Sequence, residues 1–182
     1  MNNVEVSGSG GIGLYMYGSG MSLDGGEATV NGDIIADDLG VRVNAKDGRV
    51  TVNGNITAGH SGVQTATNPD TEVVVKGSVN VLGTTFQDVN AAGVLASGET
   101  YVKVEGDVIG RGAKYTGVYA FGGTIEVLGD VVSLSGTGAK AEPNYSYGDG
   151  EVTIYGSLSA EDIFVMVGDT EKAPEDITAP ST

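Results

Sequence analysis

A short phrase of the form V-x-V-x-G-[DNS]-[VIL] recurs along this chain of 182 residues. Clear copies, each with two apolar residues flanking a variable one and then a glycine, begin at residues 28, 50, 73, 102, 125 and 152. The segment Val4–Gly8 is interpreted as a degraded first copy. The glycines, at positions 8, 32, 54, 77, 106, 129 and 156, are spaced 22 to 29 residues apart. This short period predicts stacked repeats in a single domain, because each repeat is too small to bury its own apolar face.

Each phrase has the alternation of a half-buried β-strand. In Val50-Thr51-Val52 the two valines share one face and Thr51 lies on the other, because successive side chains of a strand point to opposite faces. We therefore expect the flanking residues of every copy to be buried and most middle residues to face water. The phrase ends at a corner such as Asn53-Gly54, where Asn and Gly tolerate the positive φ that a sharp bend needs.

Two further strands follow in each repeat. The second strand pairs a large inward residue with a small one, as in Ile34/Ala36 and Ile56/Ala58. The third strand follows another small residue, usually a glycine, and its copies lie at 14–16, 41–43, 63–65, 94–96, 118–120, 139–141 and 163–165. Turn residues such as Asp47-Gly48 then close the coil.

Three strands and three corners per repeat predict an all-β fold, a right-handed parallel β-helix (β-solenoid) of about seven three-stranded coils. Left-handed β-helices usually have coils of about 18 residues built from hexapeptides. The longer step here favours the right-handed form, as does the general handedness of parallel crossovers. Two alternatives are a β-sandwich with regular turns and a β-propeller, which needs about 40 residues per blade.

The repeat pattern also bounds the domain. The β-helix is predicted over residues 1–167, whereas residues 168–182, with Pro174 and Pro180 among Thr, Ser and Glu, are expected to form an extended linker or tail to a further module. The longer steps indicate insertions at Gly83–Ala92 and Glu142–Tyr147. The first residues lack the charged and apolar regions of a signal peptide, so we expect a fragment of a longer protein.

The charge balance limits the partners. With 24 acidic and 9 basic residues the formal net charge is −15, which repels nucleic-acid phosphate and anionic lipid. No apolar run approaches the roughly 18 residues needed to span a bilayer, so we expect neither nucleic-acid binding nor membrane insertion. The chain has no cysteine, which excludes disulfides and thiolate metal sites, and we expect no cofactor.

Small polar residues follow the corner glycines and would form a ladder along one edge of the solenoid. Asp33, Asp107 and Asp130 occupy equivalent positions, with Asn or Ser in other coils. Asp, Asn and Ser suit a turn after glycine, which is the structural interpretation. The alternative is a catalytic or calcium-binding ladder. We assign no catalytic residue and no metal ligand. The single histidine of the sequence, His60, cannot form a multi-histidine metal site and is interpreted as a loop residue.

Aromatic and cationic residues gather around the outward middle position of the third strand. Exposed aromatic rings commonly stack on sugars or on peptide partners. The chain therefore has a possible ligand face for a glycan or a surface protein, and the alternative is packing under the inserted loops. The residues of this predicted face are Tyr15, Arg42, Tyr115, Tyr119, Phe121 and Phe164.

The repeat V-x-V-x-G-[DN]-[VI], with its third-strand G-V-x-x-x, resembles the β-helical repeat regions of large bacterial surface proteins of the adhesin and autotransporter-passenger type. The resemblance covers Val4 to about Val167. It implies an extracellular rod at the bacterial cell surface, a stalk or adhesin surface that belongs to a longer polypeptide with further domains. It carries over no catalytic residue, so a non-enzymatic role is expected. A carbohydrate-binding module and a polysaccharide lyase or hydrolase are the alternatives.

Overall fold

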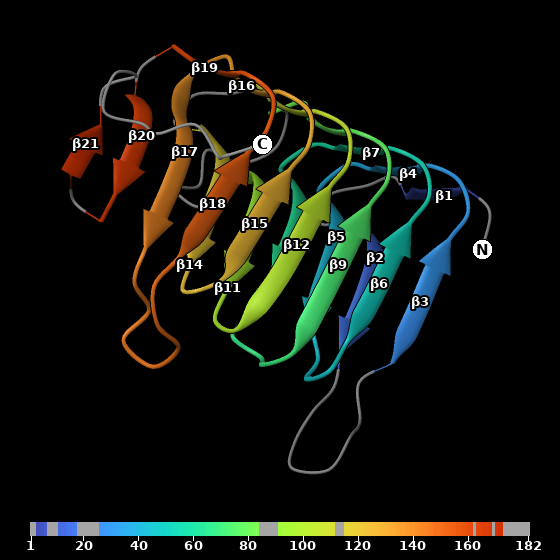
Figure 1. Cartoon of the computed structure of the whole chain (residues 1–182). Coiled ribbons are helices and arrows are strands. Elements are labelled where there is room, and N and C mark those ends of the chain that lie inside the picture. Colours follow the sequence, from blue (N-terminus) through green and yellow to red (C-terminus); the bar gives the residue numbers. More distant parts are fainter. Residues whose placement is uncertain are drawn as a thin grey trace.

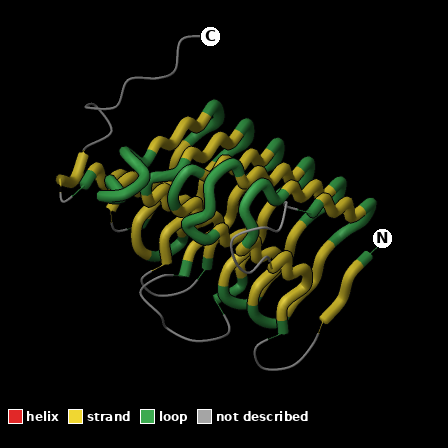
Figure 2. The backbone as a smooth tube through the Cα atoms, turned by 90° about the horizontal axis from the view of Figure 1, so that it is seen from below, coloured by secondary structure: helices red, strands yellow, loops and turns green. Residues whose placement is uncertain are grey.

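The computed structural model describes residues 3–6, 11–17, 26–83, 91–111, 115–161, 163–168 and 170–172. Over these residues the chain winds into a solenoid whose strands form three long sheets (Figure 1). Each coil stacks on the one before, so that strands of neighbouring coils run side by side (Figure 2). The predicted all-β parallel β-helix is confirmed.

The strands of successive coils alternate regularly among the three sheets. Sheet A contains β1 (Val4–Val6), β4 (Ile34–Ala36), β7 (Ile56–Ala58), β10 (Val79–Val81), β13 (Val108–Gly110), β16 (Val131–Ser133) and β19 (Leu158–Ala160). Sheet B contains β2 (Ile12–Tyr17), β5 (Leu39–Asn44), β8 (Ser61–Thr65), β11 (Ala92–Ser97), β14 (Tyr115–Phe121), β17 (Gly136–Glu142), β20 (Ile163–Val167) and β21 (Thr170–Lys172). Sheet C contains β3 (Glu27–Val30), β6 (Arg49–Val52), β9 (Thr71–Val75), β12 (Thr100–Val104), β15 (Thr124–Val127) and β18 (Glu151–Ile154).

The V-x-V strands of sheet C stack valine on valine. β9 pairs in parallel with β6 and β12, so that Val52, Val75 and Val104 form one column, and all three side chains are completely buried. The intervening residues Thr51 and Lys103 are only partly buried, which confirms the expected alternation. Burying one valine contributes roughly 1.5–3 kcal/mol relative to leaving it exposed, and the stacked columns repeat this contribution in each coil.

The solenoid has about six coils rather than seven, because the first described strand belongs to a different sheet than predicted. β1 pairs with β4 in sheet A, with Val4 opposite Ile34, so the interpretation of this segment as a degraded V-x-V copy is wrong. The residues downstream explain the difference. A V-x-V strand is followed six residues later by a large apolar residue, as Ile56 follows Val50, whereas Gly10 stands six residues after Val4.

The corner glycines are required by close packing between coils. A Cβ atom on Gly54 would lie 2.5 Å from the carbonyl oxygen of Gly32 and 2.5 Å from Asp33 Oδ1. Gly54 itself does not have a positive φ, so the expectation of a left-handed conformation at this corner is wrong. Left-handed residues occur instead at the third corner, between sheets B and C, where Asp47 and Asp70 have φ angles of 55° and 58°.

A second column of glycines lies at the start of the third strand. A Cβ atom on Gly40 would lie 2.3 Å from Ile56 Cγ2 and 2.6 Å from the carbonyl oxygen of Gly62. The glycine therefore leaves room for a large sheet-A side chain of the next coil and for the backbone stacked on it. This contact explains why a glycine precedes most copies of the third strand.

The last coil is shifted by two residues from the sequence assignment. In β20, Val165 pairs with Ala139 and Met166 with Lys140. The prediction that Phe164 takes the outward position beside Lys140 is therefore wrong, and the Phe164 side chain lies outside the described part of the structure. Since no glycine precedes this copy of the third strand, the sequence had no marker for its register. β21 then pairs antiparallel with β20, within the segment expected to be a linker.

Candidate functional site

The polar residues after the corner glycines form a continuous hydrogen-bonded ladder along the edge between sheets C and A. In each rung a side-chain oxygen accepts the backbone N–H of the equivalent residue in the next coil. The rungs are Asn3 to Asp33 (3.2 Å), Asp33 to Asn55 (2.7 Å), Asn55 to Ser78 (2.9 Å), Ser78 to Asp107 (3.0 Å), Asp107 to Asp130 (2.9 Å) and Asp130 to Ser157 (2.7 Å). The structure thus places all three predicted aspartates on one line, with Asp107 and Asp130 adjacent.

This ladder stabilises the stacking of the coils. A corner N–H that is not paired within a sheet needs another acceptor, and the side chain of the preceding coil supplies it. The Ser157 hydroxyl adds a second hydrogen bond of 2.8 Å to Asp130. Among the described residues, no group of three or more His, Asp or Glu side chains is arranged to hold a metal ion. These contacts favour the structural interpretation of the aspartates over the catalytic or calcium-binding one.

The hydrogen bonds also lower the pKa of one ladder carboxylate. The Ser157 N–H, and after it the Ser157 hydroxyl, holds the pKa of Asp130 below its ordinary value of 3.8. A carboxylate whose pKa is lowered by folding stabilises the fold fully above its unfolded pKa. That contribution is lost as the pH falls through the folded pKa.

We therefore expect the melting temperature of the protein to decrease as the pH falls below 3.8, and to decrease less steeply in Asp130→Asn. The amide keeps an acceptor oxygen for Ser157 but does not titrate. Circular dichroism melts on both sides of this pH, at constant ionic strength, measure the two slopes. Asp149→Asn, which removes an exposed carboxylate outside the ladder, should retain the wild-type slope. Equal slopes for wild type and Asp130→Asn would contradict the linkage.

The outer face of sheet B carries predicted ligand-face residues in two separate places. The Arg42 guanidinium lies 5.8 Å from the centre of the Tyr15 ring, and the Tyr15 side chain is 48% exposed. Tyr119 and Phe121 of β14 have ring centres 6.2 Å apart and planes tilted by 44°. β8 and β11 lie between the two pairs in the sheet, so the structure does not bring them together into one face.

Tyr119 is held by charged neighbours on its own face. Its hydroxyl donates a hydrogen bond to Glu142, and Lys140 Nζ lies 4.9 Å from the ring centre and 2.8 Å from Glu142 Oε1. Partial burial, together with this hydrogen bond and the Glu142 charge, raises the pKa of Tyr119 far above its usual range. The hydrogen bond and the ion pair therefore fix the Tyr119 side chain against Glu142 and Lys140.

Tyr115 was predicted on this face, and that prediction is wrong. Its side chain is 1% exposed and lies in the core. The inward second-strand position of the same coil is Gly110, where a Cβ atom would lie 1.4 Å from the ring, so the glycine provides the space. The alternation also breaks in β14, because Gly117 and Val118 are both buried. The Tyr115 hydroxyl has no hydrogen-bond partner in the part of the chain that the structure describes.

His60 lies at the corner between β7 and β8. Its Nδ1 atom is 3.2 Å from Ser61 Oγ and 4.0 Å from Asp38 Oδ1. In a Ser-His-Asp triad the serine and the carboxylate contact opposite ring nitrogens, whereas here both lie on the Nδ1 side and Nε2 has no partner among the described residues. Ser61 Oγ also accepts the Ala92 N–H at 3.3 Å. This geometry favours a structural role for His60 over a nucleophile–base pair.

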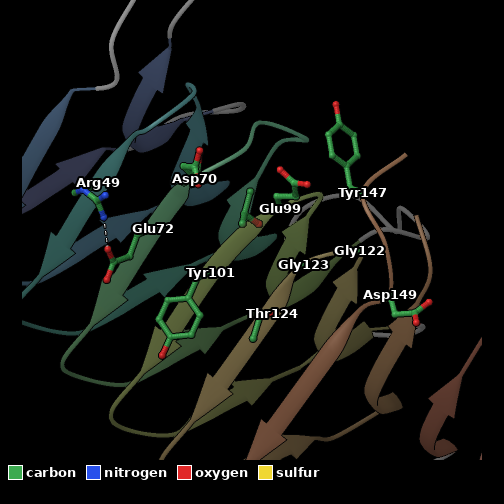
Figure 3. A pocket seen from close by; sticks show the side chains of 12 residues that line it. Arg49, Asp70, Glu72, Glu99, Tyr101, Gly122, Gly123, Thr124, Tyr147 and Asp149 are labelled. Carbon is green, nitrogen blue, oxygen red and sulfur yellow. Dashed lines mark hydrogen bonds and ion pairs between the residues drawn. The ribbon is translucent and has the colours of Figure 1, made fainter. Parts of the chain in front are cut away.

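A shallow groove that the sequence analysis missed crosses the outer face of sheet C (Figure 3). Its volume is about 600 Å³. It is lined by residues of the third corners, by the first residues of the sheet-C strands and by the β17–β18 connection. Because the lining comes from successive coils, the groove extends along the solenoid axis. Prominent side chains in it are Arg49, Asp70, Glu72, Glu99, Tyr101 and Tyr147.

The groove is acidic and contains two tyrosines. Arg49 forms an ion pair with Glu72, and the Tyr101 hydroxyl donates a 2.6 Å hydrogen bond to Glu126. Burial and then this hydrogen bond raise the pKa of Tyr101 far above its usual range. The residue just before each V-x-V phrase could have indicated this groove in the sequence. Pairing of β6, β9 and β12 places these residues, Arg49, Glu72 and Tyr101, side by side in adjacent coils. The predicted ligand face consisted of outward residues of the third strand instead.

One wall of the groove is formed by residues 143–149 of the β17–β18 connection, which we call the arm. Asn144 organises it: its N–H donates to the Gly148 carbonyl at 2.8 Å, its carbonyl accepts the Tyr147 N–H at 3.0 Å, and its Oδ1 accepts the Ser146 N–H at 3.1 Å. A Cβ atom on Gly122 would lie 2.5 Å from Asn144 Cβ, so the arm packs directly on the groove floor. The arm lies at the predicted Glu142–Tyr147 insertion and holds Tyr147 at the rim.

Comparison of the chain with protein-family models, with curated proteins and with solved structures finds no match. Within the described residues, no helix is long and apolar enough to cross a membrane.

Proposed function

We propose that this chain is a non-enzymatic β-solenoid that acts at the bacterial cell surface, outside the cell, as a stalk or adhesin surface. The observation that carries the proposal is the ladder. Each predicted aspartate, Asp33, Asp107 and Asp130, accepts a backbone N–H from the next coil. A polysaccharide-cleaving site needs carboxylates that are available to substrate, whereas these side chains hold coils together.

The architecture supports the same role. Coils stack at about 4.8 Å, so about six coils form a rod roughly 29 Å long. Such a solenoid keeps its sheet faces aligned along its length and presents extended surfaces to partners. We propose a glycan or another surface protein as the partner and further domains of the same polypeptide beside the rod.

A carbohydrate-binding module is the second candidate, and the groove of sheet C favours it. The two tyrosines Tyr101 and Tyr147 and several carboxylates line this groove. The sheet-B residues around Tyr119 favour it less, because β8 and β11 separate them from Tyr15 and Arg42, so that the predicted residues do not form one face. The binding surface of this candidate therefore lies on sheet C.

The test incubates the protein with plant, mucin and bacterial polysaccharides, with and without calcium, and measures released reducing ends, unsaturated products and retention on each immobilised glycan. We expect no release. Retention without release supports an adhesin, and the absence of both supports a stalk. Turnover by the wild type would overturn the proposal. Loss of that turnover in Asp107→Asn would assign the reaction to the ladder, because the amide preserves the acceptor for the Asp130 N–H and removes only the charge.

A further inference from the structure

The geometry points to the groove of sheet C as a binding site for an extended, uncharged oligosaccharide that lies along the solenoid axis. This inference rests on the proposed adhesin role and specifies its ligand. The site is formed by Tyr101 and Thr124 on sheet C, by the Gly122-Gly123 floor and by Tyr147 and Asp149 of the arm.

The shape of the groove selects a chain-like ligand. Its lining comes from the coils of β6, β9, β12 and β15 and from the arm before β18, so it follows several coils at about 4.8 Å per step. It is open along this length, whereas pockets for compact small molecules enclose most of their ligand. An extended oligomer can therefore contact successive coils while its ends remain in solvent.

The floor and walls provide the contacts that sugars require. Gly122 and Gly123 leave the floor without side chains between Tyr101, which lies on sheet C, and Tyr147, which stands on the arm (Figure 3). A pyranose ring can approach such a floor closely, and aromatic rings stack on the C–H face of sugars. The Tyr101 hydroxyl is bound to Glu126 and the arm is braced by Asn144, so little side-chain freedom is lost on binding.

The charges of the lining select against acidic glycans. The carboxylates of Asp70, Glu99 and Asp149 have no hydrogen-bond or ion-pair partner among the described residues, and the single lining cation, Arg49, is paired with Glu72. Carboxylate oxygens accept hydrogen bonds from sugar hydroxyls, whereas they repel uronate, sulfate and sialate groups. A neutral oligosaccharide satisfies both conditions.

The experiment is calorimetric titration of the protein with cellohexaose, xylohexaose, mannohexaose and hexa-N-acetylchitohexaose, with hexagalacturonate as the acidic probe and hexalysine as the cationic one. We expect at least one neutral hexasaccharide to bind, and to bind at least about tenfold more tightly than hexagalacturonate. Tyr147→Ala should weaken this binding about tenfold or more. Tyr147→Phe, which keeps the ring, should retain most of it.

The matched control is Tyr15→Ala, which removes an exposed tyrosine of sheet B that does not line the groove and should leave the affinity unchanged. Circular dichroism melts establish that each variant is folded. The inference is overturned if no neutral hexasaccharide binds, if hexalysine binds more tightly than all of them, or if Tyr147→Ala and Tyr15→Ala bind alike. If none of the probes binds, the proposed stalk role is unaffected, whereas cleavage of any probe would overturn the non-enzymatic proposal itself.

Discussion

We expect Val104→Asp to abolish cooperative folding of several coils of the solenoid. Val104 is completely buried in sheet C, with Val75 and Val127 as its neighbours in the adjacent coils. A carboxylate at this position would lose its hydration without gaining a partner, at a cost of several kcal/mol. The total stability of a typical domain is only about 5–15 kcal/mol, and each coil depends on the coils that stack on it.

The control for Val104→Asp is the same substitution on the other face of the sheet. Val74 is only partly buried and lies opposite Lys103 in the next strand, so the carboxylate of Val74→Asp remains hydrated next to a cation. Far-UV circular dichroism during thermal unfolding should show a strongly reduced or absent transition for Val104→Asp and a transition close to wild type for Val74→Asp. Equal melting curves for the two variants would show that the assigned inward and outward faces are wrong.

The second large change in stability is expected at Tyr115, where Tyr115→Ala should lower the free energy of unfolding and Tyr115→Phe should raise it. Tyr115→Ala should lose about 3–5 kcal/mol of the free energy of unfolding, because it empties the space of a fully buried ring. Tyr115→Phe keeps the ring and removes a buried hydroxyl that has no partner among the described residues. We expect it to gain about 1 kcal/mol, since a buried unpaired polar group carries a desolvation cost.

Urea unfolding of the three proteins, analysed by linear extrapolation, measures both changes. Tyr145→Ala is the matched control, because the Tyr145 side chain on the arm is fully exposed, and it should unfold at the wild-type midpoint. A loss in Tyr115→Phe as large as that in Tyr115→Ala would contradict the assignment, because it would show that the hydroxyl makes an essential hydrogen bond.

Local alternation of residues was sufficient to predict most of the architecture. A phrase such as Val50-Thr51-Val52 predicts which side chains are buried, because neighbouring side chains of a strand point to opposite faces. In the structure both valines are completely or almost completely buried. The repeated phrase also predicts that coils stack in register, since identical apolar columns align only in that way. The ladder position could be read from the residue after each corner glycine for the same reason.

The candidate site was predicted less well, because its members come from different coils. Arg49, Glu72 and Tyr101 are separated by more than twenty residues in the chain and become neighbours only through strand pairing. The arm adds Tyr147 through a network of backbone hydrogen bonds around Asn144. No local pattern marks such a groove, although the charged and aromatic residues before the V-x-V phrases contained part of the signal.

The sequence by itself determined the parallel β-helix and the buried face of each V-x-V strand, because both follow from a period-two pattern that recurs every 22 to 29 residues. It also determined the ladder of corner residues, because a polar residue follows the same glycine in each repeat. Only the tertiary structure decided where that alternation breaks. Gly117 and Val118 are both buried in β14, and Gly110 vacates the space that Tyr115 fills. It also placed Val4 in sheet A and Val165 opposite Ala139, since pairing between coils depends on which stacked neighbours fit together and not on the order of residues within one strand.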